Sequence, residues 1–190
     1  MSKYIFYILP LFLIACNLNR KENTNEESDK VKQISATQSN DEIKLSVRFN
    51  KFDTIVEVLF QETIDSITEI QKRNFDGFVA KQDSLFADIL KTVFEFYKKS
   101  YAAYKEGWTM TGKITDDELK KYLPKPTTPD DLKSFITPAI IHIQDKKNCE
   151  EGTLGIEFDC TWDIENGLGV LIQKWKVVNA GVAEISYFLK

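Results

Sequence analysis

The fold is decided by one stretch near the end of the chain, Leu154-Gly155-Ile156-Glu157-Phe158-Asp159-Cys160-Thr161-Trp162-Asp163. Apolar and polar side chains alternate along it, which is the two-residue period of a β-strand with one packed face and one face toward water. Further strands are expected at residues 136–144, 170–178 and 184–189, with turns near Asn166-Gly167-Leu168-Gly169 and Asn179-Ala180-Gly181. This region therefore predicts an antiparallel meander.

The clearest helical pattern lies upstream, over residues 84–106, and we expect that helix to end at Gly107. Its apolar residues recur at the spacing of one helix face, so the stripe is expected to be core rather than a ligand pocket. The stripe consists of Phe86, Ile89, Leu90, Val93, Phe94, Tyr97, Tyr101 and Tyr104. Another short helix is expected at 65–80, and two more begin at capping signals, Thr115 and Thr128.

An N-terminal hairpin is expected from residues 43–49 and 54–60, which are strand-like and flank a polar turn. With the meander and the helices it predicts an α+β fold in a single domain at 42–190. The antiparallel sheet, made of the N-terminal hairpin and the C-terminal meander, would pack against the long aromatic-rich helix and the short helices.

The start of the chain has the pattern of an export signal. Lys3 precedes an uncharged apolar stretch at residues 4–15, too short to span a membrane comfortably. Leu13-Ile14-Ala15-Cys16 resembles a lipobox, which implies a signal peptide at 1–15, a diacylglyceryl group on Cys16 and acylation such as palmitate. Residues 16–41 are polar after the cysteine and predict a disordered tether.

Composition limits the partners and the compartment. The 190 residues carry a formal net charge of −4, which gives no basic footprint for nucleic acid. The expected location is the cell envelope, with the protein on a bacterial membrane through its lipid, most simply on the periplasmic face of the outer membrane. In that compartment Cys149 and Cys160 could form a disulfide, or Cys160 could be a buried thiol; the sequence leaves both open, as it does the oligomeric state.

The segment from Phe158 to Val170, followed by 177–188, resembles the end of the DUF6985 family, a bacterial domain of unknown function. Its members typically show a Trp-Asp-x-Glu-His-Gly-Leu-Gly run, and here it reads Trp162-Asp163-Ile164-Glu165-Asn166-Gly167-Leu168-Gly169. Asn166 replaces the usual histidine, so no role of that histidine transfers to this chain. The resemblance spans about 42–190 and associates the domain with presumed immunity proteins of toxin systems.

Few residues suggest chemistry. His142 is the single histidine and lies in an apolar run, so we assign it a structural role, and no catalytic residue, metal site or cofactor is predicted beyond the lipid. Three residues are interpreted as a structural motif: Trp162, Gly167 and Gly169. An acidic row on the polar face of the strand is the candidate binding feature: Glu157, Asp159, Asp163 and Glu165.

Three functions remain open at this stage, one of which is a purely structural component of the envelope. The first is a lipid-anchored envelope protein whose domain is a non-catalytic binding module, in immunity style, with a protein partner. The alternative is a hydrolase, metal-dependent or carboxylate-based, that uses the acidic face from Glu157 to Glu165.

Overall fold

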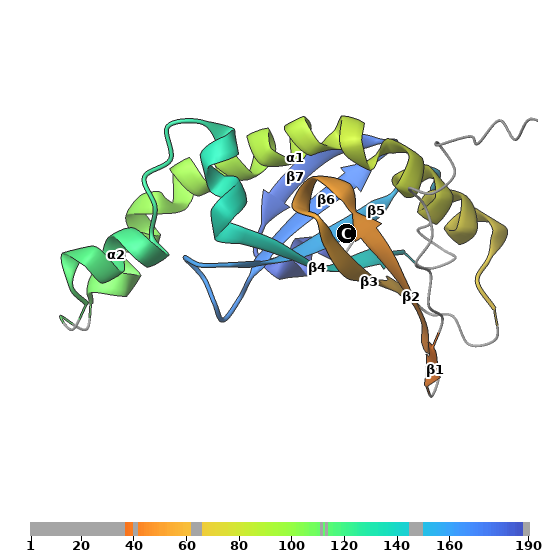
Figure 1. Ribbon diagram of the computed structural model, residues 1–190, viewed down its shortest axis with the longest axis horizontal. Helices are drawn as coiled ribbons and strands as arrows, with labels where there is room; N and C mark the ends of the chain where they lie inside the picture. Colours follow the sequence, from red (N-terminus) through yellow and green to blue (C-terminus); the bar gives the residue numbers. More distant parts are fainter. Residues whose placement is uncertain are drawn as a thin grey trace, which may run out of the picture. The chain divides into compact units, whose positions relative to one another are not determined.

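The computed structural model describes residues 37–39, 42–61, 66–110, 112, 114–144 and 150–187. Within these residues, seven strands form one sheet whose order follows the chain (Figure 1). They are β1 (Thr37–Ser39), β2 (Glu42–Phe49), β3 (Thr54–Phe60), β4 (Ile136–Ile143), β5 (Leu154–Cys160), β6 (Leu168–Gln173) and β7 (Lys176–Gly181). The α+β class is confirmed, and β1 lies inside the interval predicted to be a tether.

The sheet is mixed rather than wholly antiparallel. The hairpin β2–β3 and the meander β4–β5–β6–β7 are both present, as expected. They join through a parallel pair, β3 beside β4, in which Val58 is opposite Ile141. Parallel neighbours need a long crossover connection, and the chain between these two strands contains the long helix α1 (Glu69–Thr109). The parallel junction could not be seen from strand patterns alone.

Helix α1 is a single helix of 41 residues, where the sequence predicted two with an end at Gly107. It begins with a capping box between Thr68 and Gln71. The predicted break near residues 81–83 is helical because Gln82 has a partner in the hairpin: its amide accepts from the Asn50 N–H at 2.9 Å and donates to the Arg48 carbonyl at 3.2 Å. A polar residue in the apolar stripe is thereby satisfied in the core.

Most of the aromatic stripe of α1 is core, as predicted: Ile89, Leu90, Val93, Phe94 and Tyr97 are buried in one hydrophobic cluster with the sheet. The helix runs across one face of that sheet (Figure 1). Phe86, Tyr101 and Tyr104 of the stripe are only partly buried against the cluster. The matching face of β5 is also buried, with Leu154, Ile156 and Phe158 at 0% exposure. None of the described helices is long and apolar enough to cross a membrane.

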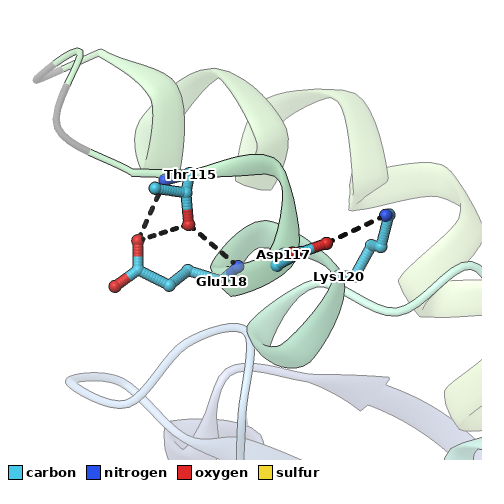
Figure 2. A network of polar contacts seen from close by, with 4 residues as sticks. All are labelled: Thr115, Asp117, Glu118 and Lys120. Carbon is cyan, nitrogen blue, oxygen red and sulfur yellow. Dashed lines mark hydrogen bonds and ion pairs between the residues drawn. The ribbon is translucent and has the colours of Figure 1, made fainter.

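Two short helical segments follow α1, both at the predicted capping signals. Helix α2 (Asp116–Tyr122) starts with a reciprocal box: Thr115 Oγ1 accepts from the Glu118 N–H, while the Glu118 carboxylate accepts from the Thr115 N–H at 2.9 Å (Figure 2). The second segment, η2 (Pro129–Phe135), is a 3₁₀ helix with proline in its first turn. Both connect α1 to β4.

The end of the chain differs from the prediction in three places, the first being that the expected turn at Asn179-Ala180-Gly181 is part of strand β7 (Lys176–Gly181). The expected strand at 170–178 is divided by a tight turn at Lys174 and Trp175, both at positive φ (50° and 59°). Where a strand was expected at 184–189, the first residues instead belong to the 3₁₀ segment η3 (Ala183–Ser186), and residues 188 and 189 lie outside the described part of the chain. Segment η3 packs so closely on β5 that a Cβ at Gly155 would overlap the Ser186 carbonyl, which explains why the second face of β5 is partly covered.

Several predictions fall outside the described residues. These are the signal peptide at 1–15, the lipobox with Cys16, most of the tether, and Cys149. Cys160 is described, and its thiol is free and buried.

Candidate functional site

A hollow of about 570 Å³ lies between the last turns of α1 and the turn after β5. Helix α1 contributes Ala103, Tyr104, Gly107 and Trp108, and the turn contributes residues 162–166. We call it the Trp108 hollow. Its volume is within the range of small-molecule and side-chain pockets.

Trp108 holds the two walls of the hollow together. Its indole N–H donates to the Trp162 carbonyl at 2.8 Å, which ties the helix to the turn. Its ring stacks on Tyr122 of α2, with centroids 5.2 Å apart and planes within 3°. The Tyr122 carbonyl accepts a hydrogen bond from Thr161 Oγ1 at 2.9 Å. Because Thr161 directly follows β5, this bond connects α2 to the end of that strand. The ring of Trp108 is therefore fixed in position before any ligand binds.

Trp162 forms the floor of the hollow. Its side chain is 1% exposed and packs on Tyr97, with ring centroids 4.5 Å apart. Its buried Nε1 makes no hydrogen bond of ordinary geometry. The indole N–H is nevertheless near the Tyr104 hydroxyl and lowers the pKa of that phenol, which is a smaller effect than that of burial. Burial, helped by the nearby Asp163 carboxylate, raises the pKa of Tyr104 to about 12, so this phenol is neutral at physiological pH.

The turn after β5 is shaped by its own side chains. Asp163 Oδ1 accepts from the backbone N–H of Asn166 at 3.1 Å and from its side-chain amide at 2.9 Å. Gly167 has φ +62°, a conformation that glycine adopts without a steric penalty. At Gly169 a Cβ would lie 2.7 Å from the Val182 carbonyl oxygen, so η3 packs against this glycine. The two glycines of the motif thus have structural explanations.

The charge of the hollow has a single sign. Asp163 and Glu165 are its charged lining residues, and neither carboxylate forms an ion pair in the described part of the chain. From residue 150 to residue 173 the sequence has six acidic and no basic residues. Between the two carboxylates in sequence, Ile164 is 73% exposed.

The predicted acidic row is not one cluster. Asp163 and Glu165 both line the hollow, but Glu157 does not: its carboxylate lies 3.0 Å from Nε2 of His142, which is 5% exposed. Asp159 is exposed. Among the described residues, no three His, Cys, Asp or Glu side chains are close enough to hold a metal ion. The structure therefore brings two of the four residues to one site.

The pair of His142 and Glu157 is a second polar feature, on β4 and β5. His142 Nδ1 is buried without a hydrogen bond, and the ring lies 5.2 Å from that of Tyr187. The pair does not line the Trp108 hollow. The structural role that the sequence assigned to His142 stays a prediction.

Sequence reasoning missed the helix side of the site. Tyr104 was counted with the core stripe, and Trp108 was placed beyond the expected end of the helix at Gly107. Because α1 continues to Thr109, both residues lie on its last turns and meet the Trp-Asp motif across the hollow. The useful signal was present: a tryptophan that follows an aromatic stripe by one helical turn.

Residues 21–188 match the family described as Domain of unknown function (DUF6985). The chain belongs to this family. The match starts earlier than the expected residue 42 and covers most of the segment predicted to be a tether. No curated protein and no solved structure is similar enough to the chain to match it. In this member of the DUF6985 family, the Trp-Asp motif forms one wall of the Trp108 hollow.

Proposed function

We propose that this DUF6985 protein is a lipid-anchored envelope protein whose domain is a non-catalytic binding module for another protein. One observation carries the binding part: the Trp108 hollow is rigid, aromatic, acidic and bordered by the exposed Ile164. Aromatic side chains in fixed positions are typical anchors of protein interfaces.

The contacts support recognition better than catalysis. Three contacts hold the surroundings of the hollow in place: Trp108 with Trp162, Tyr122 with Thr161, and Asp163 with Asn166. A general acid or base needs a titrating group within reach of substrate. Tyr104, with its raised pKa, is a hydrogen-bonding group at physiological pH rather than a base.

An exposed apolar side chain on the turn adds to this surface. Ile164 is 73% exposed and lines the Trp108 hollow. Apolar side chains that are exposed next to fixed aromatic rings are suited to contact with a protein partner. We assign the partner surface to the Trp108 hollow together with Ile164.

The binding site is tested by photo-crosslinking in living cells. The photoreactive amino acid p-benzoylphenylalanine replaces Ile164 in one strain and Val178, 48% exposed on β7, in a control strain. We expect a discrete protein adduct from position 164 and none from position 178. Equal adducts from both positions, or no adduct from 164, would contradict a partner at the hollow.

The anchor is tested separately with the Cys16→Ser substitution. The wild-type protein should take up radiolabelled palmitate and fractionate with membranes, and the variant should do neither. Retention of label and of membrane association by the variant would show that Cys16 is not the attachment point. This result would leave the binding part of the proposal unaffected.

A further inference from the structure

We propose that the Trp108 hollow binds an arginine side chain of the partner protein. This inference rests on the proposed binding function and specifies the chemical group that the partner inserts. The observations that carry it are the two carboxylates without ion pairs, the fixed aromatic wall and the size of the hollow.

The sign of the charge selects a cation. Asp163 Oδ1 is occupied by the two donors of Asn166, whereas Oδ2 has no hydrogen bond within the described residues. Glu165 is exposed and has no side-chain partner there. Two carboxylates two residues apart repel each other weakly, and a cation between them removes that repulsion. A basic group bound in the hollow is therefore attracted by both carboxylates at once.

The aromatic wall favours guanidinium over ammonium. Trp108 is held flat against Tyr122, so its ring needs no reordering when a ligand stacks. A guanidinium stacks on aromatic faces and can also donate parallel hydrogen bonds to a carboxylate, whereas an ammonium acts as a compact, strongly hydrated point charge. The neutral hydroxyl of Tyr104 can accept a further bond.

The apolar residue on the turn suits the rest of an arginine side chain. Its methylene groups prefer apolar contact while the head group is held by charge. Ile164, which is 73% exposed, lies between the two carboxylates in sequence and lines the same hollow. A cavity of about 570 Å³ has room for one such side chain and the neighbouring backbone.

The test uses the full-length protein in detergent, with 5-fluorotryptophan at its three tryptophans, and ¹⁹F NMR. The probe is the capped peptide acetyl-Gly-Arg-Gly-amide. We expect a saturable shift of the Trp108 signal and no shift of Trp175. Trp175 contacts Gly77, thirty residues before Gly107 in the same helix and so about 45 Å away along its axis.

Three further probes define the specificity. The citrulline peptide is a neutral analogue of the arginine peptide and should bind at least tenfold more weakly, and the lysine peptide should also bind more weakly. Choline chloride represents a lipid head group. Equal binding of arginine and citrulline peptides, or binding of lysine or choline as tight as that of arginine, would overturn the proposal.

A pair of matched variants tests the site. Glu165→Gln removes one charge from the hollow without removing a structural bond. It should lower the affinity for the arginine peptide about three- to tenfold. Glu151→Gln removes the same charge from an exposed residue outside the hollow and should leave affinity unchanged. Unaltered affinity in Glu165→Gln would contradict the assignment.

These results can be separated from those of the crosslinking experiment. If position 164 yields a partner adduct while the arginine peptide produces no shift of Trp108, the binding function stands and the arginine assignment fails. If the peptide binds and no adduct forms, the hollow binds cations but does not face a protein partner in the cell, and the proposal that the arginine comes from a partner protein fails.

Discussion

The absence of a side chain at Gly77 makes room for the indole ring of Trp175. A Cβ at Gly77 would overlap two carbons of that ring, so helix and ring meet at van der Waals contact. Trp175 is in the left-handed region, with φ 59°, and its N–H donates to the Gly152 carbonyl at 3.1 Å. The Gly152 N–H in turn donates to Asn74 of α1 at 2.8 Å. Through Asn74 and Gly77, the first part of α1 therefore holds in place the turn before β5, at Gly152, and the turn between β6 and β7, at Trp175.

Gly77→Ala is expected to destabilise the protein although alanine favours helix. The propensity gain of about 1 kcal/mol is outweighed by displacement of the Trp175 ring, for a net loss of about 1–2 kcal/mol. Urea unfolding followed by circular dichroism measures the change.

Two comparisons isolate the cause of that change. Gly107→Ala lies in the same helix with nothing within 4 Å of its Cβ, and should stabilise by up to about 1 kcal/mol. In a Trp175→Ala background the effect of Gly77→Ala should reverse and become stabilising. A destabilising Gly77→Ala in that background would show that the ring is not responsible.

Gln82→Met is expected to cost about 1–3 kcal/mol of unfolding free energy because it leaves two backbone groups without their partner. Gln82 is 3% exposed and bonds the Asn50 N–H and the Arg48 carbonyl of the hairpin. Methionine keeps the volume and the helix propensity, so the loss measures the hydrogen bonds alone. A chemical denaturation curve that superimposes on wild type would show that water replaces them.

Local chemistry was enough to predict most elements of the fold. Capping boxes marked the starts of α2 and η2, and period-two alternation marked β5. The errors had a tertiary cause. Gln82 interrupts the apolar stripe of α1, yet it is buried because the hairpin supplies its partners, and Trp175 occupies a turn position that usually requires Asn or Gly.

Half of the candidate site followed from the sequence. The Trp-Asp motif was identified as special, and Asp163 and Glu165 were singled out. Alternation alone then grouped them with Glu157, but the strand ends at Cys160, so the side chains after it no longer follow the two-residue period. Trp108 could be placed only when the true end of α1 was known, because its contact with Trp162 spans 54 residues.

Asp131 is expected to stabilise the protein at neutral pH and to stop doing so in strong acid. Its carboxylate accepts from the N–H groups of Thr127 and Thr128, which lower its pKa to about 2. A lowered folded-state pKa gives stability that is present above the unfolded value of about 3.9 and is lost as the pH falls through about 2. Asp131→Asn should therefore lower the melting temperature at pH 7 and have little effect at pH 2.

The control for this pH dependence is Asp130→Asn. Asp130 is exposed in the same first turn, and its side chain forms no hydrogen bond in the part of the chain described. The effect of Asp130→Asn on the melting temperature, measured against wild type, should change less between pH 7 and pH 2 than the effect of Asp131→Asn does. Equal behaviour of the two variants would assign the effect to the helix dipole instead of the threonine contacts.

Calcium is expected to leave the melting temperature unchanged within about 1 °C at millimolar concentration. The acidic row does not form one cluster of three or more ligands within the described residues: Glu157 is paired with His142, and Asp163 uses one oxygen in its turn. Differential scanning fluorimetry with calcium, magnesium and manganese provides the measurement. A rise of several degrees with any of these ions would instead favour the metal-dependent hydrolase.

Cys160 is expected to resist thiol reagents until the protein unfolds. Its side chain is 4% exposed, and burial raises the pKa of the thiol to about 12. Compared with an ordinary thiol of pKa about 8.5, the reactive thiolate at pH 8 is about a thousandfold scarcer. The Cys16→Ser/Cys149→Ser variant leaves Cys160 as the single thiol of the chain. Ellman's reagent should then release its chromophore only after addition of guanidinium chloride, whereas rapid release in buffer would show that the strand end at Cys160 opens readily.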